Sequence, residues 1–230
     1  MIRDLAISVP EAGVDVAALV EQPTQARWML VLAHGAGAGM RHAFMENLAR
    51  ELAGAGVATL RYEFPYMQQK RGRPDSPKIL TATVRAAIRA AAEASNLPLL
   101  AGGKSLGGRM TSHVFAEAAA QNLRDAFARV RGLVFYGFPL HQPGRPDVKR
   151  ASHLSQVRLP MLFLQGTRDA LADLSLLQPL CEKLEPRPTL HIVDTADHSF
   201  HVLKRSGRTD DDVLRELAHT TASWAAAETN

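Results

Sequence analysis

Apolar and polar positions alternate between two kinds of pattern along almost the whole chain. Short uninterrupted apolar runs are typical of buried strands, and between them apolar residues recur every three or four positions, as on one face of a helix. The runs predict strands at Val14–Glu21, Trp28–Gly35, Val57–Tyr62, Leu97–Gly103, Gly132–Gly137, Pro160–Gly166 and Thr189–Asp194. The amphipathic stretches predict helices at His42–Gly56, Ile79–Ala94, Leu106–Gln121, Asp173–Leu184 and Asp211–Ala227.

Strands that alternate with helices of this length predict βαβ units around a mostly parallel sheet, with helices on both faces. A chain of 230 residues suits one α/β domain, residues 1–230. Two long connections, Glu63–Lys78 and Phe138–Arg158, follow strands. Ligands of such sheets bind beyond the carboxyl ends of the strands, so both connections are candidate walls of a site, and surface loops otherwise.

Composition narrows the class of protein. Hydrophobic residues make up 46% and charged residues 22%, which is ordinary for a globular protein, and a net charge of +4 favours no nucleic-acid partner. The single cysteine, Cys181, excludes an internal disulfide and fits a helical core position. Met1–Val16 contains acids and a proline where a secretory signal needs an apolar run, and no stretch is long enough to span a bilayer. We therefore expect a cytoplasmic protein without a membrane partner.

Two glycine-rich stretches imitate nucleotide-binding motifs. Gly103-Lys104-Ser105 resembles the end of a P-loop, but Pro98 stands where that motif needs its first glycine, and proline has no N–H to offer a phosphate. The stretch His34–Met40 resembles a dinucleotide fingerprint, but Met40 occupies the last glycine position. Neither stretch predicts a bound nucleotide, and no cofactor is expected.

The segment Gly103–Gly107 also reads as G-x-S-x-G, with Ser105 between a predicted strand and a predicted helix. In this context the motif is a nucleophile elbow: a tight turn lifts the serine hydroxyl clear of the sheet. Side chains at Gly103 and Gly107 would collide where strand and helix approach closely. Ser105 is therefore the candidate nucleophile.

A serine hydroxyl needs a base, and the base needs an orienting acid. Asp169 and His198 follow the last two predicted strands, in the chain order expected of an elbow serine. Asp173 lies further into a predicted helix, and Asp194 and Asp197 lie too close to His198 in sequence to orient it well. His201 is expected on a helix surface, and no histidine or cysteine spacing predicts a metal site.

Hydrolysis of an acyl bond also needs donors for the developing oxyanion. The N–H of Leu106, directly after the nucleophile, is one candidate. The second is expected from the glycine-rich loop after the strand that ends at Ala33, with Ala36 favoured over Gly35 and Gly37. The small residues of this loop let its backbone N–H groups approach a substrate.

These motifs together resemble the α/β hydrolases. The residues that carry the resemblance are LAHGAGAGM, RYEFPYM, GGKSLGGRM, YGFPLHQPGRP, LQGTRDAL and DHSF. More narrowly, the chain resembles a small group that includes bacterial proteins, a testis-expressed protein and a subunit of a nuclear histone-acetyltransferase complex. It is similar, more distantly, to dienelactone hydrolases, which use a cysteine where this chain has Ser105. The resemblance implies an α/β-hydrolase fold and a triad of Ser105, Asp169 and His198.

The resulting expectation is a serine hydrolase that acts on a small ester, thioester or related acyl bond. No large insertion follows Gly132–Gly137, so no large lid domain is expected and the substrate is a small molecule. Phe64, Tyr66 and Phe138 are candidate pocket walls, and the basic loop 70–78 is either solvated surface or an attractor of anions. The alternative is a non-catalytic binding or scaffold protein on the same fold, as some members of the group imply. The sequence leaves the oligomeric state and the role of Lys104 open.

Overall fold

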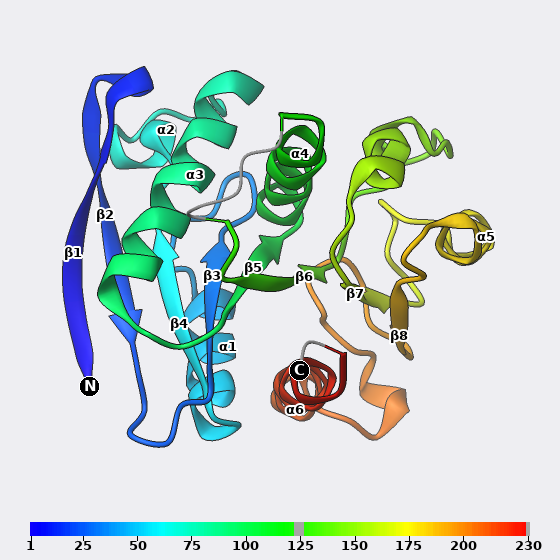
Figure 1. The fold of residues 1–230 in the computed structure, drawn as a ribbon. Coiled ribbons are helices and arrows are strands. Elements are labelled where there is room, and N and C mark those ends of the chain that lie inside the picture. The colour runs from blue at the N-terminus through cyan, green and yellow to red at the C-terminus, as the bar shows by residue number, and fades with distance from the viewer. Residues whose placement is uncertain (122–126, 229–230) are drawn as a thin grey trace.

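The computed structural model describes residues 1–121 and 127–228, which form one eight-stranded sheet with helices on both faces (Figure 1). The order of the strands across the sheet is β1-β2-β4-β3-β5-β6-β7-β8. All neighbouring strands from β4 to β8 are parallel, whereas β2 pairs antiparallel with both β1 and β4. The strands are β1 Ile2–Val9, β2 Val14–Glu21, β3 Trp28–Ala33, β4 Val57–Tyr62, β5 Leu99–Lys104, β6 Val130–Tyr136, β7 Met161–Gly166 and β8 Thr189–Val193.

The helices fall where the amphipathic pattern predicts them, and short ones lie in the connections. The main helices are α1 Ala43–Gly54, α3 Pro77–Ala94, α4 Leu106–Gln121, α5 Leu174–Lys183 and α6 Asp210–Glu228. The short elements are α2 Pro65–Gln68 and the 3₁₀ helices η1 Pro10–Ala12, η2 Lys149–Gln156 and η3 Lys204–Ser206. Because the connection from β6 to β7 contains only η2, no lid domain covers the sheet edge in the part of the chain that the structure describes.

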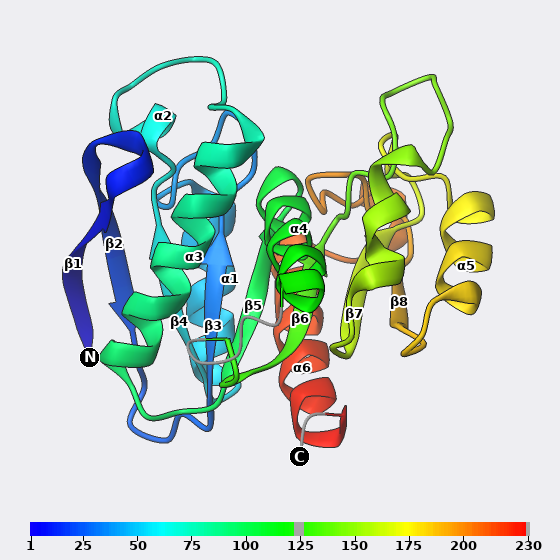
Figure 2. The same cartoon turned by 45° about the horizontal axis from the view of Figure 1, so that its top comes forward.

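The sheet separates two hydrophobic cores. The side chains of β3 alternate between them: Met29 and Val31 pack with α3 and α4, whereas Leu30 and Leu32 pack with α1 and α6. Figure 2 shows α1 and α6 together on one face, and α3, α4 and α5 on the other. Burial on both faces explains why the central strands read as continuous apolar runs rather than as alternating ones.

Strand β1 was not predicted from the sequence. This strand forms an edge of the sheet and most of its residues are exposed or half-buried, so it has no continuous apolar run. It pairs with β2 along its whole length, from Ile2 opposite Glu21 to Val9 opposite Val14. The hairpin widens the sheet on the side away from β8 and contributes no side chain to the site described below.

Candidate active site

Ser105 lies in a sharp turn between β5 and α4. Its φ angle is +50°, in the left-handed region that residues other than glycine rarely adopt. The Ser105 N–H donates to the Tyr136 carbonyl oxygen over 3.1 Å, and the Ser105 carbonyl oxygen accepts from Arg109 N–H over 3.1 Å as α4 begins. Hydrogen bonds on both sides therefore hold the strained turn, which is the geometry of a nucleophile elbow.

Gly103 and Gly107 allow this turn to lie against the end of β3. A Cβ atom on Gly103 would stand 2.3 Å from the carbonyl oxygen of Ala33, and one on Gly107 would stand 2.6 Å from the same atom. Real Cβ atoms essentially never approach backbone so closely, so any side chain here would push β5 or α4 away from β3. The two glycines are needed for close approach, as the motif predicts.

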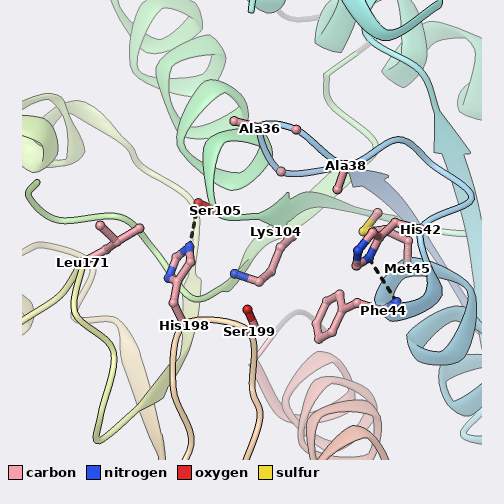
Figure 3. Close-up of a pocket in the computed structure, with 12 residues that line it drawn as sticks. Ala36, Ala38, His42, Phe44, Met45, Lys104, Ser105, Leu171, His198 and Ser199 are labelled. Carbon is pink, nitrogen blue, oxygen red and sulfur yellow. Dashed lines mark hydrogen bonds between the residues drawn. The ribbon is translucent and has the colours of Figure 1, made fainter. Parts of the chain in front are cut away.

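The structure brings Ser105, His198 and Asp169 into one hydrogen-bonded chain (Figure 3 shows its first link). His198 Nε2 lies 2.9 Å from Ser105 Oγ, and His198 Nδ1 lies 2.7 Å from Asp169 Oδ2. The Asp169 side chain is only 1% exposed, whereas that of His198 is 24% exposed. A buried acid thus faces Nδ1, leaving Nε2 to accept the serine proton at the edge of solvent.

Two further groups hold the Asp169 carboxylate. Gln165, fully buried near the end of β7, donates from Nε2 to Asp169 Oδ2 and accepts from Phe138 N–H at Oε1 over 3.0 Å. The N–H of Leu171 donates to Asp169 Oδ1 over 2.8 Å. Gln165 was not predicted as a site residue, although a glutamine near the end of an apolar strand must find partners when it is buried.

The other candidate acids have local structural roles. Asp173 caps α5 by accepting from Ser175 N–H over 2.8 Å, and these hydrogen bonds lower its pKa. Asp197 accepts from the N–H groups of Ser199 and His201, and Asp194 accepts from a threonine hydroxyl on the neighbouring loop. His201 is exposed and pairs with Asp210 at the start of α6, in an ion pair that raises the pKa of His201.

Hydrogen bonds hold the glycine-rich loop after β3 at both of its ends. His34 is fully buried; its Nε2 accepts from Phe64 N–H over 3.1 Å and its Nδ1 donates to the Gly35 carbonyl oxygen over 2.8 Å. At the far end of the loop, Glu63 Oε1 accepts from Met40 N–H over 3.1 Å. These bonds fix the loop beside Ser105, while Leu106 follows Ser105 directly as the first residue of α4.

A cavity of about 470 Å³ opens beside Ser105. Its walls come from the loop after β3, the start of α1, the end of β5 and the loops after β7 and β8 (Figure 3). The lining residues are Gly35, Ala36, Gly37, Ala38, His42, Phe44, Met45, Lys104, Ser105, Leu171, His198 and Ser199. The sequence thus anticipated the loop, Ser105 and His198, but not the wall that α1 supplies.

The three aromatic residues expected as pocket walls do not line this cavity. Phe64, Tyr66 and Phe138 are at most 1% exposed and pack in the hydrophobic core on the α3–α4 side of the sheet. Apolar side chains from α1, Phe44 and Met45, take that place at the cavity. The basic loop 70–78 does not line the cavity either, and Arg71 of that loop pairs with Asp75.

Lys104 points into this region from the end of β5. Its side chain extends toward His198 and Ser199 (Figure 3), and Nζ is buried without a hydrogen-bond partner among the described residues. The ring centres of Phe44 and Phe200 lie 6.0 and 5.7 Å from Nζ. Burial lowers the pKa of Lys104 to about 8, although the Asp169 and Asp197 carboxylates act in the opposite direction.

The described ranges of the chain, residues 1–121 and 127–228, contain neither a metal-binding cluster nor a membrane-spanning helix. No group of three or more histidine, cysteine, aspartate or glutamate side chains there could hold a metal ion. No helix in the same ranges combines the length and apolar character needed to cross a membrane.

Comparison with known proteins assigns the family. The sequence model of the alpha/beta hydrolase domain matches residues 26–226, and the chain therefore belongs to the α/β-hydrolase family. The fold and the strand–turn–helix geometry at Ser105 agree with that membership.

Solved structures share the fold at low sequence identity. A dienelactone hydrolase from Anabaena variabilis is 21% identical with a TM-score of 0.73, and the match covers 100% of this chain and 99% of that one. An α/β serine hydrolase from Xanthomonas campestris, described as having no lid, is 22% identical with a TM-score of 0.70, over 97% of this chain and 94% of that one.

A relative with a similar sequence is about twice as long as the region that matches this chain. A protein of Mycobacterium tuberculosis strain H37Rv, named as a candidate phosphoribosyl transferase, is 28% identical over 97% of this chain but only 46% of its own length. The chain thus spans about half the length of this relative. The name describes that longer protein, and its activity is not assigned to this chain.

Proposed function

We propose that the protein is a serine hydrolase that cleaves a small ester, thioester or related acyl bond. The observation that carries the proposal is the continuous hydrogen-bonded chain from Ser105 through His198 to the buried Asp169. Nucleophile, base and orienting acid each lie in a loop beyond a strand end, and the serine occupies a strained elbow. This combination matches what acyl transfer by a serine requires.

The proposed reaction has two halves. His198 Nε2 takes the Ser105 proton while Oγ bonds to the acyl carbon, and the bond from that carbon to the leaving oxygen or sulfur breaks as Nε2 returns the proton to it. A water molecule then attacks the acyl-enzyme with His198 again as base, releasing the acid and restoring Ser105. Asp169 stabilises the imidazolium that forms in each half.

The developing oxyanion is proposed to accept hydrogen bonds from the Leu106 N–H and from the loop after β3. Ala36 lines the cavity beside Ser105, as do its neighbours Gly35 and Gly37. His34 and Glu63 hold this loop, so its donors are positioned before substrate binds. Preorganised donors of this kind lower the barrier because they need no reorientation during the reaction.

The open sheet edge supports a small or accessible substrate. The β6–β7 connection contributes only η2, so within the described residues the cavity beside Ser105 has no lid that would enclose a long acyl chain. We also propose, from the motifs GGKSLGGRM and DHSF, that the chain belongs to the small group that includes a testis-expressed protein and a histone-acetyltransferase-complex subunit. A cytoplasmic location and a single domain over residues 1–230 remain predictions.

A fluorophosphonate probe and short para-nitrophenyl esters test the proposed function. We expect wild-type protein to be labelled, and Ser105→Ala to lose both labelling and turnover. His198→Ala should lower kcat by at least about 10³-fold, since an unassisted serine is a poor nucleophile. Ser112→Ala is the matched control, because Ser112 also bonds a histidine, His153, but lies outside the cavity.

The same assay decides between an enzyme and a scaffold protein. Wild-type turnover no faster than buffer across acyl lengths, together with absent labelling, would favour the non-catalytic alternative. Labelling that survives in Ser105→Ala would place the reactive group elsewhere.

A further inference from the structure

The cavity beside Ser105 is lined by a lysine but by no acidic residue. Its twelve lining residues include one lysine, Lys104, and no carboxylate. Burying an ammonium group away from water is costly unless it is paired. Among the described residues, the Lys104 ammonium group next to the reacting serine thus has no hydrogen-bonded partner.

The nearby acids are engaged elsewhere. Asp169 accepts from Gln165, Leu171 and His198, while Asp197 accepts from two backbone N–H groups of its own loop. Neither forms an ion pair with Lys104 among the described residues. The Phe44 and Phe200 rings beside Nζ supply no hydrogen-bond acceptor of the strength of a carboxylate.

We propose that Lys104 is a specificity-determining residue that binds a carboxylate on the acyl part of the substrate. The preferred substrates are then esters or thioesters of short dicarboxylic acids, in which one carboxyl group is esterified and the other is free. This inference rests on the proposed serine-hydrolase function and names the substrate class of that site.

The geometry favours the acyl side over the leaving group. The leaving group takes its proton from His198 Nε2, on the partly exposed ring, and departs. The acyl group stays bonded to Ser105 and occupies the adjacent cavity, whose wall includes Lys104. Nζ forms no hydrogen bond with the described residues, so all of its donors are available to a carboxylate bound in the cavity.

A pair of nearly isosteric substrates tests the proposal. The para-nitrophenyl ester of hydrogen glutarate carries the free carboxylate, and the para-nitrophenyl ester of glutaramic acid carries a neutral amide in its place. We expect wild-type kcat/KM to favour the anionic ester. Lys104→Met should lower the anionic-to-neutral ratio by about 10–100-fold, the range for a charge-assisted hydrogen bond. Lys104→Arg should retain part of the preference.

Lys78→Met is the matched control, because Lys78 is exposed at the start of α3 and does not line the cavity. The anionic-to-neutral ratio of kcat/KM in Lys78→Met should equal that of the wild type. An anionic-to-neutral ratio that is unchanged in Lys104→Met would overturn the proposal. If kcat/KM falls equally on both esters, Lys104 acts on the reacting groups rather than on the carboxylate, and if it falls on neither, Lys104 has no role in recognition.

A binding measurement separates failure of this proposal from failure of the proposed function. In Ser105→Ala protein, monomethyl glutarate should bind at least about 10-fold more tightly than methyl glutaramate by NMR titration, and Lys104→Met should remove the difference. This preference supports carboxylate recognition even if the wild type hydrolyses neither ester. Equal binding of both ligands to Ser105→Ala would refute it even if the wild type is an active hydrolase.

Discussion

Two adjacent residues, Lys104 and Ser105, each cost folding free energy, one by the burial of its charge and the other by its backbone conformation. Ser105 adopts a positive φ, and Lys104 carries an ammonium group that is buried without a hydrogen bond among the described residues. Such costs persist only where surrounding contacts compensate for them, and they cluster at functional sites. The pairing of a strained serine with a buried cation at one turn distinguishes this elbow from a simple connection between strand and helix.

The buried charge predicts that Lys104→Met stabilises the protein near neutral pH. The pKa of Lys104 is about 8 in the folded state, below its ordinary value of 10.5. The folded protein therefore binds this proton less tightly than the unfolded chain does. Methionine keeps the apolar stem and removes the charge. We expect the free energy of unfolding to rise by about 3 kcal/mol at pH 7, measured by urea denaturation.

The sign of the pH dependence provides the check. Below pH 8 both states carry the charge and the folded state bears the full cost, which then declines as pH rises from 8 to 10.5. The advantage of Lys104→Met should decline over the same window. The groups that act on Lys104 are Asp169 and Asp197, with the ring of His198 nearby. A destabilised variant, or a gain independent of pH, would contradict this account of the buried charge.

Sequence reasoning located residues whose roles follow from their place in the chain. Ser105, Asp169 and His198 each follow a strand of the parallel part of the sheet, and parallel strands deliver such residues to one sheet edge. It could not place Lys104 or Gln165, because the direction of a long side chain depends on neighbours from other segments. The expectation for Phe64 and Tyr66 was wrong at this cavity for a similar reason: α2 turns the chain there, and both residues are fully buried.

At the scale of elements, Gln165 connects two strand ends to the candidate triad. It bonds Phe138 after β6 and Asp169 after β7. Gln165→Leu should leave the buried Phe138 N–H unpaired and loosen Asp169. We expect the free energy of unfolding to fall by about 1–3 kcal/mol and kcat on a para-nitrophenyl ester to fall about 10-fold, with KM little changed.

Thr167→Val is the control for this element. Thr167 also joins the loops after β7 and β8, by accepting from Thr195 N–H and donating to Asp194, but it is not among the groups that hydrogen-bond the Asp169 carboxylate. The Thr167→Val variant should lower the free energy of unfolding and leave kcat nearly unchanged. If both variants lower kcat in proportion to lost stability, Gln165 has only a structural role.

Among the strands, those at the centre of the sheet were the most readily predicted. The central strands were found because both of their faces pack against helices, which leaves an apolar run in the sequence. Edge strand β1 lacks such a run, and its pairing with β2 depends on the hairpin rather than on burial. The short elements α2 and η2 lie in connections whose conformation is set by contacts distant in sequence.

At the scale of the whole molecule, the site exists only when distant segments meet. The loops after β3, β5, β7 and β8 all contribute lining residues, and the loop after β6 supports Asp169 through Gln165. Ser105 and His198 are 93 positions apart in the chain. A site assembled in this way depends on the entire parallel part of the sheet.

This dependence predicts that reactivity and fold are lost together. Fluorophosphonate labelling of Ser105 and far-ultraviolet circular dichroism should decline at the same urea concentration, as expected if residues 1–230 unfold as one domain. Labelling that disappears at lower urea than the circular dichroism would instead show that the loops after β7 and β8 open before the sheet unfolds. The Thr167→Val variant, which weakens the contact between those loops, should then widen the gap between the two transitions, whereas a single cooperative unit would shift both midpoints equally.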